Sequence, residues 1–67
     1  MTVEHKILHL VDRGLVNRKD LTALVGPKAN REGLRMHDAG LLQFAKPPWL
    51  TLTKLGVERL NELDGQS

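Results

Sequence analysis

Basic and amide side chains between residues 17 and 46 are of the types that bind a polyanion. This segment has six basic and three acidic residues, a net charge of +3, whereas the rest of the chain has a net charge of −1. Such a local patch steers association with a polyanion more than the total charge of +2 does. A solvated surface of mixed charge accounts for the same residues equally well. The candidate contacts are Arg18, Lys19, Lys28, Asn30, Arg31, Arg35 and Lys46.

Within this segment, arginine and asparagine are the residues able to read base edges. Arginine pairs with guanine through two hydrogen bonds, and asparagine pairs with adenine in the same way. Arg31 and Arg35 are four residues apart, so on a helix they would be neighbours on one face. In the alternative interpretation, Asn30 caps the local backbone and both arginines are solvated or paired with Glu32 and Asp38.

Three further cations would bind without reading sequence. Arg18 and Lys19 stand at the start of a predicted helix, where the backbone N–H groups also favour phosphate. Lys46 is the one charge of a predicted hairpin and could touch a phosphate or the minor groove. Such contacts would position a protein on the duplex without specifying its sequence.

Other chemistry has little support in the sequence. His5 and His9 have the spacing of two metal ligands on one helix face, but no third ligand completes a recognisable set. The chain has no cysteine, which excludes a disulfide scaffold and cysteine-containing zinc sites. Serine occurs only at Ser67, and there is no glycine-rich phosphate loop. We therefore expect a protein without metal, cofactor or enzymatic activity.

Hydrophobic periodicity and capping residues predict the elements that would position these side chains. Helices are expected over 2–13, 18–25, 28–39 and 53–63, with a β-hairpin over 41–52. The side chains expected to cap helix starts are Thr2, Asn17 and Thr53. Gly26-Pro27 predicts a tight turn between the second and third helices. In the third helix, Ala29, Gly33 and Met36 share one small face that should pack closely on a neighbour.

The remaining apolar residues predict where the core lies. We expect the second helix to be buried along Leu21, Leu24 and Val25. The last helix carries the apolar residues Leu55, Val57, Leu60 and Leu63. That helix should close at Asp64-Gly65, leaving Gln66-Ser67 as a frayed tail.

Two large apolar residues fall off these core lines. Leu34 is about 200° from Met36 around the helix, which makes it a flank residue or an exposed contact. Strand alternation puts Trp49 opposite Leu50 and Leu52. The favoured interpretation has this tryptophan covering the first helix or the hairpin root, and the alternative is contact with a protein partner.

The length of 67 residues predicts a single domain, 1–67, with a mostly helical α+β fold. No apolar stretch approaches the roughly 20 residues of a membrane span, and no signal peptide is apparent. We expect a cytoplasmic protein with no membrane partner.

Three segments resemble the winged helix-turn-helix superfamily of small DNA-binding domains. They are residues 20–26, residues 36–41, and the Leu-Thr-x-x-Gly-x-x-x-Leu pattern of residues 52–60. The resemblance implies a three-helix bundle with a β-hairpin wing and a C-terminal helix, whose third helix enters the DNA major groove. The chain departs from the pattern at Thr22, where alanine is usual, at Gly33, and in the short spacing from Gly26 to Gly40.

Together these observations predict a non-enzymatic protein that binds double-stranded DNA, as a transcriptional regulator or architectural factor. The family and the small core further imply a homodimer. The alternative is a protein-interaction module that docks on a partner protein and modulates it. The low net charge and the apolar residues Leu34 and Trp49 favour that alternative.

Overall fold

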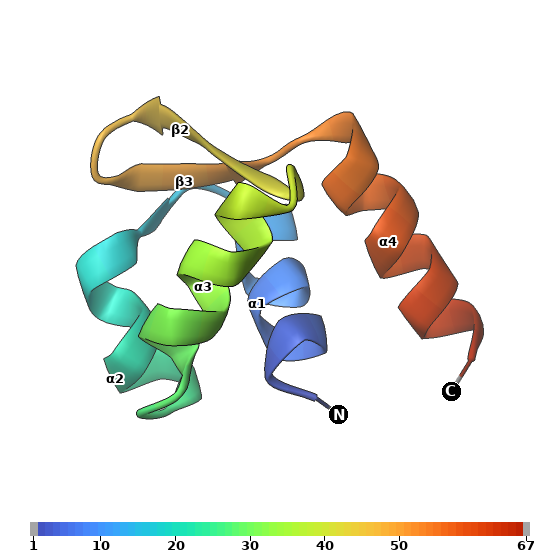
Figure 1. Ribbon diagram of the computed structural model, residues 1–67, viewed down its shortest axis with the longest axis horizontal. Coiled ribbons are helices and arrows are strands. Elements are labelled where there is room, and N and C mark those ends of the chain that lie inside the picture. Colours follow the sequence, from blue (N-terminus) through green and yellow to red (C-terminus); the bar gives the residue numbers. More distant parts are fainter. Residues whose placement is uncertain (1, 67) are drawn as a thin grey trace.

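The computed structural model describes residues 2–66 and has the expected class, a small α+β domain (Figure 1). Its elements are α1 Val3–Asp12, β1 Val16–Asn17, the 3₁₀ turn η1 Arg18–Asp20, α2 Leu21–Val25, α3 Ala29–Asp38, β2 Leu42–Lys46, β3 Trp49–Leu52 and α4 Lys54–Gly65. Figure 1 shows α1, α2 and α3 beneath the sheet, with α4 packed beside α1.

Side-chain caps begin the helical segments at the predicted places. The hydroxyl of Thr2 accepts from the N–H of His5 at 3.2 Å, and the amide oxygen of Asn17 accepts from the N–H of Lys19 at 2.9 Å. Thr53 starts α4 in the same way. Its hydroxyl accepts from the N–H of Gly56 at 3.0 Å. All these caps satisfy backbone donors that a helix start leaves unpaired.

The strands form one antiparallel sheet in the order β1-β3-β2. The hairpin of β2 and β3 pairs Leu42 with Leu52 and Phe44 with Leu50, and the register shifts before Lys46. On the other side of β3, Val16 pairs with Leu50. The central strand β3 therefore pairs with both β1 and β2. The predicted hairpin is confirmed.

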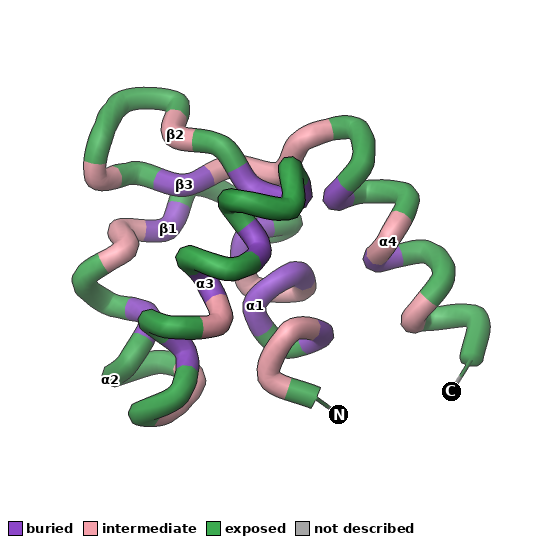
Figure 2. Tube along the Cα trace, viewed as in Figure 1, coloured by how far each residue is buried: buried purple, intermediate pink, exposed green. Residues whose placement is uncertain are grey.

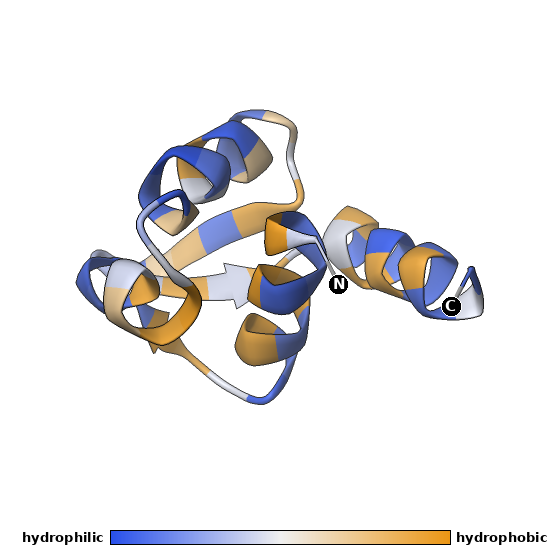
Figure 3. Cartoon of the chain, turned by 90° about the horizontal axis from the view of Figure 1, so that it is seen from below, coloured by the Kyte–Doolittle hydropathy of each residue, from blue (hydrophilic) through white to orange (hydrophobic). Residues whose placement is uncertain are grey.

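The core lies between this sheet and the three helices beneath it (Figure 2). The most deeply buried large side chains are Ile7, Leu8, Leu21, Met36, Leu42 and Leu50. Ala29, Gly33 and Met36 of α3 are all buried, as predicted. Viewed from below, hydrophilic residues cover most of α3, whereas α2 is mainly hydrophobic (Figure 3).

The second helix differs from the prediction. Residues 18–25 do not form one helix but a 3₁₀ turn followed by an α2 of only five residues. Leu21 packs into the core, whereas Leu24 is 59 % exposed. With Leu21 turned toward Gly33 of α3, Leu24 faces a shallow pocket that it shares with Leu10 of α1. The expected burial of Leu24 is therefore wrong.

The last helix ends at Gly65, as predicted. Gln66, which was expected in a frayed tail, caps this helix through an N–H that donates to the Leu63 carbonyl. Only a narrow strip of α4 faces the core, because only Gly56, Leu60 and Leu63 lie on one line along the helix. Leu55 and Val57 flank that line and are 50 % and 42 % exposed. Ser67 lies outside the described residues.

Two glycines allow backbones to approach closely. A Cβ on Gly33 would lie 2.9 Å from a methyl group of Leu21, which confirms the expected close contact between α3 and α2. A Cβ on Gly56 would lie only 2.1 Å from the carbonyl oxygen of Leu41. Since that obstacle is backbone, the start of α4 can sit where it does only with glycine at this position.

Within residues 2–66, no helix combines the length and the apolar character needed to cross a lipid bilayer. The expected boundaries of α3 and of the hairpin strands are met to within one or two residues.

Candidate nucleic-acid interface

The outer side of the α2–turn–α3 unit gathers most of the predicted polar contacts. A shallow pocket at the start of both helices is lined by Arg18, Lys19, Thr22 and Asn30. A second pocket beside it is lined by Pro27, Lys28, Arg31 and Glu32. Hence residues from the 3₁₀ turn and from the first turn of α3 meet on one surface, although the Gly26 turn separates them in sequence.

Most of these cations have no protein partner. In the described part of the chain, Arg18, Lys19, Lys28 and Arg31 take part in no ion pair. The Arg18 side chain is half-buried, and its Nε is a buried donor without an acceptor in the protein. A charged donor left in this way is a ready partner for an anionic ligand.

Arg35 lies in a different environment. Its guanidinium pairs with Glu32 on the same helix, and its Nη2 lies 3.9 Å from Glu4 of α1. The hydrogen bond that Arg35 donates to Glu32 raises the pKa of Arg35 above its ordinary value. The pairing with Glu32 agrees with the alternative interpretation of the sequence. Contact of Arg35 with DNA stays a prediction and would require this arginine to leave Glu32.

Glu4 joins this pairing to α4. Its carboxylate accepts from Nε of Arg59 at 3.1 Å and from Nη2 at 3.4 Å, and its side chain is only 15 % exposed. Arg59 also donates to Glu62 at 3.2 Å. The hydrogen bonds that Arg59 donates to Glu4 and, to a smaller extent, to Glu62 raise the pKa of Arg59. Charges on this side of α3 therefore tie α1, α3 and α4 together.

The β2–β3 hairpin meets the polar surface at its tip. The carbonyl of Pro48 accepts from the backbone N–H of Arg18 at 2.9 Å, which holds the tip against η1. Lys46 is exposed near that tip and has no ion-pair partner among residues 2–66. The hairpin thus offers one free cation close to the start of α2.

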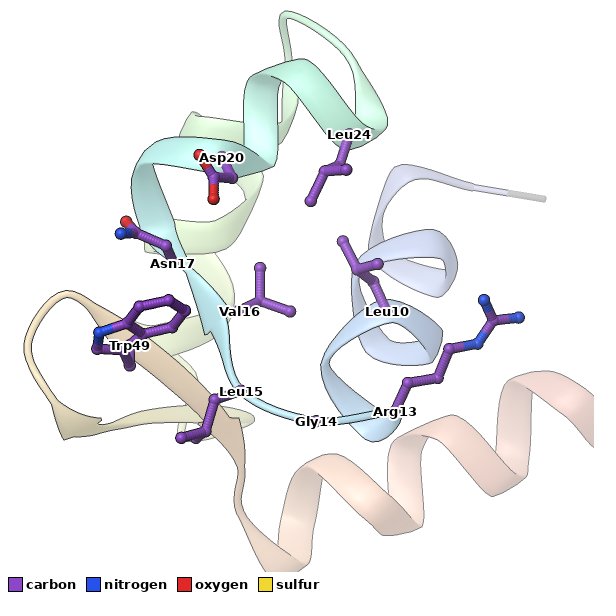
Figure 4. Close-up of a pocket in the computed structure, with 9 residues that line it drawn as sticks. All are labelled: Leu10, Arg13, Gly14, Leu15, Val16, Asn17, Asp20, Leu24 and Trp49. Carbon is purple, nitrogen blue, oxygen red and sulfur yellow. The ribbon is translucent and has the colours of Figure 1, made fainter.

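The two predicted apolar contacts are exposed but do not lie together. Leu34 is 42 % exposed on the outer side of α3. Trp49 is also 42 % exposed and lines a pocket between α1, α2 and the hairpin. Figure 4 shows Leu10 and Leu24 pointing toward one another across this pocket, with Trp49 at its edge. Trp49 opens β3 beside the Pro47-Pro48 tip, so it does not cover the hairpin root.

Sequence reasoning did not include two residues that belong to these sites. Thr22 is exposed and lines the polar pocket with Asn30, and its exposure could be inferred only once the α2–α3 crossing was known. Asp64 approaches both histidines of α1 from α4, a contact between distant parts of the chain that spacing along one helix cannot reveal.

Comparison of the chain with protein-family models, with curated proteins and with solved structures found no match. The fold and the placement of charged and apolar side chains are therefore what bears on function.

Proposed function

We propose that the protein binds double-stranded DNA as a small non-enzymatic regulator or architectural factor of winged helix-turn-helix type. The observation that carries this proposal is the polar pocket lined by Arg18, Lys19, Thr22 and Asn30. Donors from η1 and from the start of α3 meet in this pocket. Lys28 and Arg31, which have no charged partner in the described chain, line the pocket beside it. Convergent basic and amide groups of this kind suit a phosphate backbone with base edges behind it.

The roles of the residues follow from their positions. Arg18 and Lys19, at the start of the first segment, would contact phosphates and set the position of the protein. Asn30 and Arg31, in the first turn of α3, would reach base edges once that helix lies in the major groove. Lys28 precedes α3 and would contact the flanking phosphate. Lys46 would extend the contact from the hairpin.

Salt dependence tests the phosphate contacts. In a fluorescence-anisotropy titration of a labelled random-sequence duplex, affinity should fall steeply as salt rises, because binding releases counterions. Lys19→Gln should lower the slope of log affinity against log salt by about one. Lys54→Gln is the matched control, because it removes the same charge from the exposed start of α4. Equal effects of both changes would contradict the proposed surface.

Base reading by Arg31 is tested with a selected duplex library. Arg31→Gln should weaken the preferred site by about 1–3 kcal/mol and relax preference at one position. Arg13→Gln, an exposed change at the end of α1, serves as the charge-matched control. A loss that is equal on all sequences would assign Arg31 to phosphate instead.

A second candidate function is a protein-interaction module, and the exposed apolar pocket favours it. Leu24 and Leu15 are 59 % and 58 % exposed around the same pocket as Trp49. A second copy of the chain is the first partner to test, since we also propose a homodimer. In sedimentation equilibrium, Trp49→Ala should shift the protein toward monomer, whereas Leu34→Ala should do so only if α3 forms the interface. A monomeric parent would remove the homodimer from the proposal.

The proposed compartment is the cytoplasm. The cysteine-free composition supports it, because such a chain gains nothing from an oxidising compartment.

A further inference from the structure

Three metal-ligating side chains from opposite ends of the chain meet beside α1. His5 and His9 stand one turn apart on α1, and Asp64 stands in the last turn of α4. The Nε2 of His5 donates to Oδ1 of Asp64 at 2.6 Å, and the Nε2 of His9 donates to the same oxygen at 2.8 Å. One ligand atom from each residue lies within 4.8 Å of the others.

The chemistry of this set suits a transition-metal dication. Imidazole nitrogen and carboxylate oxygen are ordinary zinc ligands, and many zinc sites use three protein ligands with water in the fourth position. Both Nε2 atoms are directed at one point, so the two rings already converge. The ring centroids are 4.8 Å apart, close enough for both to bind a single ion.

A small movement, together with loss of the proton that each Nε2 donates, would convert the hydrogen-bonded cluster into a coordination shell, so binding should release protons. With zinc–ligand distances of about 2.0–2.1 Å, neighbouring ligands in a tetrahedral site are about 3.3 Å apart. The observed contacts of 2.6 and 2.8 Å would therefore lengthen by about half an ångström on binding. The side chain of Asp64 is 45 % exposed in the last turn of α4.

The two histidine side chains are buried to different extents, so an ion can enter from the exposed side of the cluster. The His5 side chain is 9 % exposed, whereas that of His9 is 38 % exposed. The base of the site is thus held in the core and its rim faces solvent. Hydrogen bonds from His5 and then His9 keep the pKa of the Asp64 carboxyl below its ordinary value.

We propose that His5, His9 and Asp64 form a site for a divalent transition metal of the zinc class, which fastens the end of α4 to α1. The proposal is independent of DNA binding, because its ligands lie on α1 and α4 and not on the polar surface of α2 and α3. Without metal, the same residues hold the two helices by hydrogen bonds. With metal, the folded state gains the free energy of binding, since a site built from residues so far apart in sequence is absent from the unfolded chain.

Cobalt and zinc are the probes for this site. The chelator-treated full chain, free of any histidine tag, should bind an equimolar amount of Co²⁺ with the visible absorption of four-coordinate cobalt, and Zn²⁺ should displace it. Zinc should also raise the melting temperature of the parent. His9→Gln and Asp64→Asn should each weaken binding by more than about 10-fold. Both positions are exposed enough for the variants to fold, which circular dichroism can verify.

The matched control is His37→Gln, which removes an exposed histidine distant from Asp64. It should bind cobalt and zinc like the parent. Unchanged zinc affinity in His9→Gln and Asp64→Asn would overturn the proposal, and so would the absence of saturable binding by the parent. Either result would leave the DNA-binding proposal intact, because that proposal uses other residues and another assay.

Discussion

Two regions of the molecule use the same kinds of charged residue in opposite ways. On the outer side, around η1 and the first turn of α3, the cations of the polar surface have no charged partner in the described chain. Where α1, α3 and α4 meet, Arg35 and Arg59 are paired with Glu4, Glu32 and Glu62. We call this second region the seam. Arginine in the seam holds helices together, whereas arginine on the outer side is available to a ligand.

The difference shows that the position of a partner, not the residue type, decides what an arginine does. Arg31 and Arg35 are one helical turn apart and look equivalent in the sequence. Only Arg35 reaches a glutamate on another helix. Changes in the seam should therefore alter stability, and changes on the outer side should alter binding with little effect on stability.

The largest effect on stability is expected at Gly56, where α4 enters the seam. Gly56→Ala would place a methyl carbon 2.1 Å from the Leu41 carbonyl oxygen, so the start of α4 would have to move away. We expect a loss of about 3 kcal/mol or more in urea denaturation, the upper range for overpacking. Gly65→Ala in the same helix is the control, because a Cβ there meets nothing within 4 Å. Equal stability of both variants would show that α4 is not held as described.

A smaller loss is expected at Thr53, which links the end of α3 to the start of α4. Its hydroxyl accepts from the N–H of Gly56 and donates to the carbonyl of Gly40 at 2.5 Å. Thr53→Ala should cost about 1 kcal/mol, while Thr53→Ser, which keeps the hydroxyl, should be nearly neutral. Urea melts that place Thr53→Ser beside Thr53→Ala would mean that the hydroxyl makes no contribution.

The smallest effect in the seam is expected from its ion pairs, because the arginines of these pairs are partly exposed to solvent. Glu4→Gln should lower the melting temperature slightly at low salt, and the difference from the parent should shrink as salt rises. Glu58→Gln, an exposed change on α4, is the control and should leave the melting temperature unchanged. A salt-independent loss at Glu4 would indicate that packing, not charge, holds this part of the seam.

Local signals in the sequence predicted much of the fold. Caps at Thr2, Asn17 and Thr53 depend on a few neighbouring residues, and the buried face of α3 depends on helical periodicity alone. The split of residues 18–25 and the exposure of Leu24 depend on how helices cross, which no local pattern records.

The candidate site was predictable to a similar degree. The sequence identified the basic residues, because their types and their placement around one turn were visible. It did not separate Arg31 from Arg35, since Glu4 lies on another helix. It also did not complete the histidine pair, because Asp64 comes from the opposite end of the chain.

A heteronuclear NMR titration with a random-sequence duplex tests most directly whether the outer side binds DNA. The account predicts chemical-shift changes at the backbone amides of Arg18, Lys19, Asn30 and Arg31, which weaken steeply as salt rises. The amides of Arg59 and His9, in and beside the seam, should stay unchanged. Shift changes centred on the seam, or none at low salt, would contradict DNA binding by this surface.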